Sequence, residues 1–144
     1  MNRPQPQHRT AVDKGSAAVE MVLATPLLVL VLLTVVALGR VADARLIVSD
    51  AAHQAARAAS LARTDTEAHA SAQSIAHTTF TDAHSACTHP RVTIDTDGLT
   101  PGSSTAATVT CTADLGDLTH IGMPGTVTIT GTAHSPVDRF RSSP

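Results

Sequence analysis

The sequence predicts an α+β fold in which a long N-terminal helix is followed by a small antiparallel sheet of about three strands. Two observations predict this fold. An uncharged apolar run near the N-terminus gives way to an amphipathic pattern that repeats every three or four residues, which is typical of one long helix. After Cys87 the apolar residues instead alternate with threonines, and this period of two is typical of β-strands.

The apolar run predicts a membrane-spanning helix. No charged residue occurs from Met21 to Gly39, and about 20 helical residues with a rise of 1.5 Å each cross the roughly 30 Å hydrocarbon core of a bilayer. Pro26 does not argue against this, because membrane helices tolerate a proline when neighbouring groups satisfy the freed carbonyl. We therefore assign residues 16–39 to a transmembrane helix and residues 1–15 to a leader in front of it.

The charges on either side of the run predict its orientation. Arg3, Arg9 and Lys14 precede it against a single acidic residue, whereas the following flank mixes acidic and basic residues. By the positive-inside rule the N-terminus then lies in the cytoplasm. The expected location is the cell membrane, crossed once, with the C-terminal part outside.

Glu20 lies close to the start of the run, shortly after Gly15. A secretory signal peptide has an apolar region of only about 7–15 residues, whereas a cut between Gly15 and Ser16 would leave the whole run as the new N-terminus. The freed amine of Ser16 would lie at the positive end of the helix dipole, and the Glu20 carboxylate, one turn on, would offset that charge. A lone glutamate at membrane depth costs about 2.5–3.5 kcal/mol, so we expect a partner, either this amine or that of an adjacent subunit. The alternative is an interfacial residue of an ordinary anchor.

This arrangement of Gly15 and Glu20 resembles the processing site of type IV pilins and pseudopilins. The stretch from Lys14 to Arg40, and PVDRF at 136–140, look like the TadE-like minor pilins of the tight-adherence (Tad/Flp) pilus systems, although Met21 stands where that family usually has an aromatic residue. The resemblance implies a pilin-like fold, cleavage after Gly15 by a prepilin peptidase, and a structural role in assembling a type IV-like surface pilus. The implied partners are other pilin subunits and the pilus assembly machinery.

Residues 40–86 predict an amphipathic, alanine-rich helical region. Small residues recur every three or four positions along one face, here named the alanine seam: Val41, Ala44, Val48, Ala51, Ala55, Ala58 and Ala62, with Ile47 and Leu61 widening it. Because alanines allow another backbone to approach closely, the seam can pack against neighbouring subunits or against the chain's own sheet. A second helix can begin near Thr64 or Thr66, with this buried stripe: Ala68, Ala72, Ile75, Ala76 and Phe80.

Residues 87–144 predict a small extracytoplasmic β domain. Threonines alternate with apolar residues in three stretches, 91–95, 105–115 and 126–134. Glycine and proline pairs punctuate both connections, so an antiparallel meander is expected.

The residues after the predicted membrane helix have few large apolar side chains, and Phe80 and Phe140 are the only aromatic residues of the chain. Small domains with poor cores usually depend on disulfides or on assembly with other chains. Cys87 and Cys111, both after the membrane span, predict one intrachain disulfide worth about 3 kcal/mol. An intermolecular bridge or free thiols are the alternatives.

The sequence offers no pattern for an enzyme, a cofactor or a metal, or for binding nucleic acid. The net charge is −2 and the Lys and Arg residues are scattered, whereas nucleic-acid binding needs a basic patch. No nucleophile motif, phosphate-binding loop or paired catalytic carboxylates can be assembled. His84, Cys87 and His89 are close in sequence, but zinc sites generally need four ligands with paired spacings, and Cys87 is better explained by a disulfide.

Two other functions remain open from the sequence. The chain could be a single-pass membrane-anchored envelope accessory protein that binds a partner through its exported domain. It could also be a secreted protein cleaved at Ala42-Asp43-Ala44. A filament subunit would leave the cell with sheared appendages, an anchored protein would stay with the membrane, and N-terminal sequencing would detect the third case.

Overall fold

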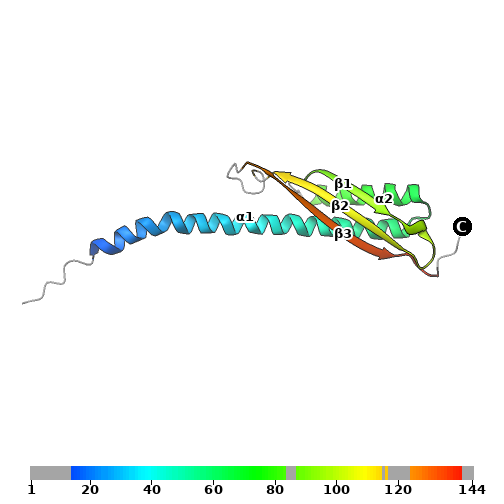
Figure 1. Ribbon diagram of the computed structural model, residues 1–144, viewed down its shortest axis with the longest axis horizontal. Helices are drawn as coiled ribbons and strands as arrows, with labels where there is room; N and C mark the ends of the chain where they lie inside the picture. Colours follow the sequence, from blue (N-terminus) through cyan, green and yellow to red (C-terminus); the bar gives the residue numbers. More distant parts are fainter. Residues whose placement is uncertain (1–13, 84–86, 115, 117–123, 141–144) are drawn as a thin grey trace, which may run out of the picture. The chain divides into compact units, whose positions relative to one another are not determined.

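The computed structural model describes residues 14–83, 87–114, 116 and 124–140. Its helices are α1 (Lys14–Leu61) and α2 (Asp65–Asp82), and its strands are β1 (Cys87–Asp95), β2 (Ser104–Asp114) and β3 (Thr126–Pro136), with a short 3-10 helix η1 (Asp97–Leu99) after β1 (Figure 1). Residues 1–36 and residues 37–144 form two compact units. The predicted class, a long apolar helix followed by a three-stranded antiparallel sheet, is confirmed.

In the first unit, the described residues belong to α1, which continues through Pro26 without a break. Two hydroxyl groups in this part are satisfied by the helix itself. Thr25 Oγ1 donates to the carbonyl oxygen of Met21 at 2.7 Å, and Thr34 Oγ1 donates to that of Leu30 at 2.8 Å. These polar groups therefore do not need water, as a helix in lipid requires.

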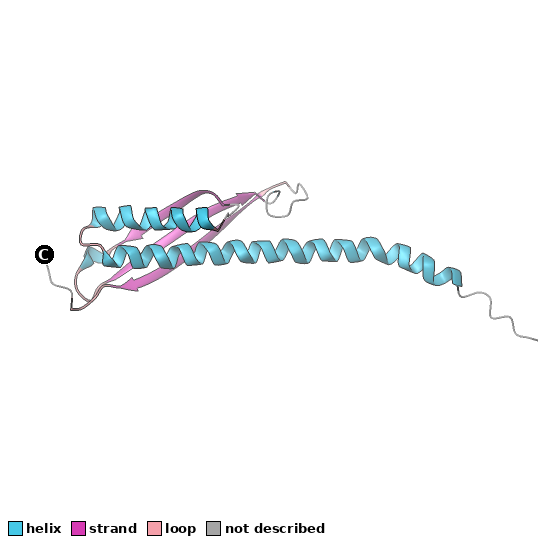
Figure 2. Ribbon diagram, turned by 180° about the vertical axis from the view of Figure 1, so that it is seen from behind, coloured by secondary structure: helices cyan, strands magenta, loops and turns pink. Residues whose placement is uncertain are grey.

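In the second unit, α1 and α2 cover one face of a sheet with strand order β1-β2-β3 (Figure 2). Both strand pairs are antiparallel, with Val92 opposite Val109 and Cys111 opposite Ile129, so the predicted meander is confirmed. Strand β1 begins at Cys87, earlier than predicted, because an irregularity in the register between Thr88 and Arg91 lets pairing continue across Pro90.

The sheet has the predicted buried and threonine-bearing faces. In β2 every second residue is buried, from Thr105 to Ala113. On the other face, the hydroxyl groups of Thr108 and Thr132 lie 3.2 Å apart across β2 and β3. One face therefore packs against the helices, while the other is a surface of threonine pairs.

The alanine seam packs mostly inside the chain. Ala44, Val48, Ala51, Ala55 and Ala62 are buried, Val41 is partly buried and Ala58 is half-buried. Neighbouring alanines widen the buried face, namely Ala52, Ala56 and Ala59. Leu61, expected to widen it, is 73% exposed at the end of α1. Most of the described seam positions are therefore covered within the chain, in one core that contains residues of both the sheet and α2.

Small side chains matter here because α1 and β3 approach each other closely. A Cβ atom on Gly131 would lie 3.0 Å from the carbonyl oxygen of Val48 and 3.2 Å from backbone atoms of Ser49. Thr105 in β2 is fully buried. Its hydroxyl group can donate to the carbonyl oxygen of Ala56 at 3.0 Å or to that of Ser135 at 3.2 Å. The helix and the sheet thus meet backbone to backbone, with little space for larger residues.

Helix α2 begins where the sequence places an N-cap. Thr64 Oγ1 accepts a hydrogen bond from the Glu67 amide at 3.2 Å, and a Glu67 carboxylate oxygen accepts one from the Arg63 amide at 2.9 Å. Four of the five expected stripe residues are buried: Ala68, Ala72, Ala76 and Phe80. The prediction for Ile75 is wrong. This side chain is 37% exposed, because it lines a surface groove between α1 and α2 rather than the core.

Cys87 and Cys111 form a disulfide, with their Cα atoms 5.7 Å apart. It joins the first residue of β1 to the middle strand of the sheet. The largest fully buried side chains in the described residues are modest in size: Val48, Val109, Val137, Thr105 and Cys111. A core built from such side chains gains little from each buried residue, so the covalent link is a major part of its stability.

Candidate functional site

The main candidate site is the apolar surface of the first part of α1, here named the apolar stretch and running from Val19 to Leu38. Every large apolar side chain in it is exposed, by 42% to 72% of its surface. A helix that is apolar on all sides needs an apolar environment such as lipid or other helices. Helix α1, which contains this stretch, is long and apolar enough to cross a membrane by length and composition, and it is the one such helix among the described residues.

Gly15, Ser16 and Glu20 lie in the first two turns of α1. Ser16 and Glu20 are four residues apart in a helix, so they lie one turn apart on the same face, as the charge argument requires. The Glu20 side chain is exposed, and no described residue forms an ion pair or hydrogen bond with its carboxylate. Glu20 therefore lies exposed among apolar side chains on this helix, where a carboxylate usually pairs with another group.

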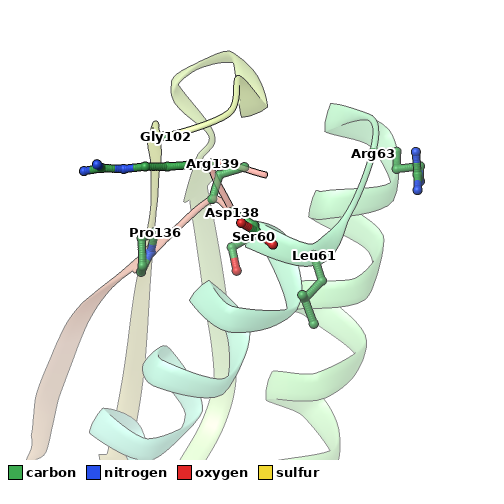
Figure 3. A pocket seen from close by; sticks show the side chains of 8 residues that line it. Ser60, Leu61, Arg63, Gly102, Pro136, Asp138 and Arg139 are labelled. Atoms are coloured by element: carbon green, nitrogen blue, oxygen red, sulfur yellow. The ribbon is translucent and has the colours of Figure 1, made fainter. Parts of the chain in front are cut away.

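Several surface hollows occur on the described part of the second unit, one of them between α2 and β1 at Gln73 and Arg91. Another, of about 570 Å³, lies where α1 ends and the chain leaves β3, and its lining includes Ser60, Leu61 and Asp138. Figure 3 shows the side chains of Arg63 and Arg139 extending in opposite directions away from each other. They do not converge on one point, so this hollow offers no paired-arginine clamp for an anion.

Another hollow is the α1–α2 groove, of about 280 Å³, between the last third of α1 and the end of α2. Apolar Ile47 and Ile75 line it together with the acidic residues Asp50 and Asp82. Sequence reasoning missed this groove, because Ile75 falls on the same helical period as the buried stripe. The exposure of an isoleucine next to two carboxylates is visible only once α2 is placed beside α1.

The comparisons bear on α1. Residues 15–57 match the family model described as TadE-like protein. This match confirms the resemblance to TadE-like proteins, and residues 15–57 are called the TadE-like segment below. It includes Gly15, Glu20, the apolar stretch and the first part of the alanine seam. Searches of curated proteins and of solved structures found no match.

The TadE-like segment lies on the helix that is long and apolar enough to cross a membrane. It ends before α2, so the match does not extend to the sheet or to residues 136–140.

The remaining candidates from the sequence can also be placed. Ala42, Asp43 and Ala44 lie inside α1, and Ala44 is buried against the core, so the secretory cleavage hypothesis would require a cut within packed helix. Cys87 is bonded to Cys111 and is not free to bind a metal as a thiolate. His84 and the side chain of His89 lie outside the described residues. No group of three potential metal ligands occurs in the part of the chain that was described.

Proposed function

We propose that this protein is a minor pilin or pseudopilin, held in the membrane by its TadE-like segment before it takes part in assembling a Tad-type surface pilus. The observation that carries the proposal is the exposure of the whole apolar stretch of α1, while the alanine-rich part of the same helix packs under a sheet. The first part needs partners outside the chain, whereas the second already has them. This is what a subunit needs if it exchanges lipid for neighbouring helices.

The proposal assigns a role to each part of the chain. Residues 1–15 are a cytoplasmic leader that a prepilin peptidase removes after Gly15, and residues 16–39 span the membrane. Residues 40–86 are the helical region, and residues 87–144 are the β domain outside the cell. Glu20 pairs with a Ser16 amine, of its own chain or of an adjacent subunit, and so sets the register between subunits.

The role of Glu20 can be tested by comparing filament incorporation with membrane insertion. We expect Glu20→Ala to insert in the membrane at least as well as the parent, because it removes a charge from the apolar surface. Its amount in sheared filaments should fall, because the subunit amine loses its partner. The measurement is the ratio of tagged protein in sheared and membrane fractions, with Leu46→Ala, an exposed site outside the apolar stretch, as the control. Equal ratios for Glu20→Ala and the parent would contradict the role.

Processing can be tested separately by intact-mass analysis of the membrane-extracted protein. In cells with an active prepilin peptidase, the mass should correspond to a chain that begins at Ser16. A chain that still begins at Met1 would contradict cleavage, although the filament role could persist with the leader in place.

A second candidate is a membrane-anchored envelope accessory protein. It is favoured by the second unit, in which most of the alanine seam is covered within the chain and therefore needs no neighbouring subunit. Such a protein would stay with membranes after shearing, in the same fractionation experiment. It would then bind a partner through its exported domain without entering a filament.

A further inference from the structure

The C-terminal end of the second unit presents an aromatic side chain to the outside. Phe140 is 95% exposed, although Phe80, the other aromatic residue of the chain, is buried. An exposed phenylalanine keeps its apolar surface in water, so a free energy gain follows only when another group covers it. Phe140 is therefore a candidate contact residue.

The backbone before Phe140 is held in place. Val137 is 1% exposed, its amide donates to the Ser103 carbonyl at 2.9 Å, and its carbonyl accepts from the Gly102 amide at 3.2 Å. Asp138 Oδ1 then accepts a hydrogen bond from the Phe140 amide at 2.9 Å. This local turn fixes the direction in which the chain leaves β3, so less conformational entropy is lost when Phe140 binds.

The α1–α2 groove has the matching chemistry. Its volume is about 280 Å³, which gives room for one aromatic side chain. Ile47 and Ile75 supply apolar surface, Asp50 and Asp82 supply negative charge, and no described lining residue is basic. Arg139 precedes Phe140 and Arg141 follows it in the sequence, so the segment carries positive charge on both sides of its aromatic residue.

The groove and Phe140 lie toward opposite ends of the second unit. Asp138 and Arg139 line the hollow at Ser60 and Leu61, where α1 ends. The groove is next to Asp50, ten residues earlier in the same helix, which corresponds to about 15 Å along its axis. Because Val137 is anchored at the far end, the chain's own Phe140 cannot fill its own groove without breaking those contacts.

We propose that Phe140 of one copy docks into the α1–α2 groove of a second copy, with Arg139 facing Asp50 and Asp82. The contact joins different surfaces of the two copies, so it is heterologous and leaves one Phe140 and one groove of each pair available for further copies. The inference deepens the proposed filament function by naming a contact between the exported units. Unlike the role of Glu20, this contact lies outside the apolar stretch.

The test is photo-crosslinking of the full-length protein in cells. Benzoylphenylalanine replaces Phe140, which keeps an aromatic group at the site, and two tags distinguish adducts between copies from adducts within one. We expect adducts between copies that map to residues 47–54 or 75–83. The same photo-crosslinker at Thr128, on the exposed face of β3, is the matched control and should not give them. Adducts only to another protein, only within one copy, or only outside the groove would overturn the proposal.

Charge reversal provides a second measurement. Asp50→Arg should lower the yield of groove adducts by about two- to fivefold, the range for an exposed ion pair, and Arg139→Asp in the same chain should restore it. Equal yields in all variants would overturn the pairing. Groove adducts from a protein that never appears in sheared filaments would refute the filament function but not the contact. A protein that appears in sheared filaments but gives no groove adducts would refute the contact but not the filament function.

Discussion

The two parts of helix α1 differ in side-chain size and in what surrounds them. The apolar stretch consists largely of leucine and valine, and all of these side chains are exposed. From Ala44 onward the buried positions are nearly all alanine, and these side chains are covered by the chain itself. The comparison shows that apolarity alone does not decide what a helix contacts, because the larger and more apolar side chains are the ones without a partner in the chain.

The physical reason lies in the neighbours available to each part. Lipid adapts to any apolar surface, so large side chains carry no packing constraint there. A sheet is rigid, and here Gly131 of β3 lies against the backbone of α1 at Val48 and Ser49. Only small residues fit at such a distance, and each buries little apolar area. The packed part is therefore closely fitted but buries little apolar area per residue, whereas the apolar stretch accepts different apolar side chains but needs an apolar environment.

The largest predicted effect comes from a charged residue substituted into the apolar stretch. Leu30→Asp should disfavour membrane insertion by about 3–4 kcal/mol, the difference between the two residues at the centre of a spanning helix. Leu46→Asp is the matched control, because Leu46 is similarly exposed but follows the apolar stretch. Carbonate extraction of membranes measures the retained fraction, which should fall for Leu30→Asp alone. Equal retention of both variants would contradict a spanning role.

The second prediction tests how far the packed part depends on its disulfide. Replacing both Cys87 and Cys111 with serine should lower the free energy of unfolding of the second unit by about 3 kcal/mol, because the unfolded chain gains conformational entropy when the disulfide no longer closes the loop. The measurement is denaturant unfolding of the detergent-solubilised full chain, followed by circular dichroism under oxidising conditions. A reducing agent should destabilise the parent by a similar amount but leave the double variant unchanged. A parent that runs as a disulfide-linked dimer on a non-reducing gel would point to a bridge between chains.

The smallest prediction makes one substitution in two settings. Gly131→Ala should cost about 1–3 kcal/mol, because its Cβ would lie 3.0 Å from the Val48 carbonyl oxygen and the backbone must shift. Gly39→Ala should instead stabilise α1 by about 0.5–1 kcal/mol, because a Cβ at Gly39 meets nothing within 4 Å. Denaturant unfolding of the second unit measures the effect of Gly131→Ala, and the loss of helical circular dichroism of the detergent-solubilised chain on heating measures that of Gly39→Ala. Stabilisation by Gly131→Ala as well would show that glycine's backbone freedom, rather than the close approach of β3 to α1, decides the result.

Several elements could be predicted because their causes are local. The cap at Thr64 depends on residues within one turn, and the alternation in β2 repeats at a fixed period. Ile75 and Leu61 were misplaced because helical periodicity assigns a residue to a face but does not say where the covering element ends. For the candidate site, the arrangement of Gly15, Glu20 and the apolar stretch is set by sequence spacing, whereas the α1–α2 groove joins residues from two helices and has no local pattern.

The sequence by itself determined that the chain has an apolar helix of spanning length, a threonine-rich sheet and two cysteines after the apolar run, since these follow from composition and period. Only the tertiary structure decided that the alanine seam is largely covered by the chain's own sheet and α2, and that Phe140 and the groove lie toward opposite ends of the second unit. From the sequence, the alanine seam could pack equally well against a neighbouring subunit or against the chain's own sheet. Which one occupies it depends on how closely β3 can approach α1, and that distance is a property of the folded chain and not of any stretch within it.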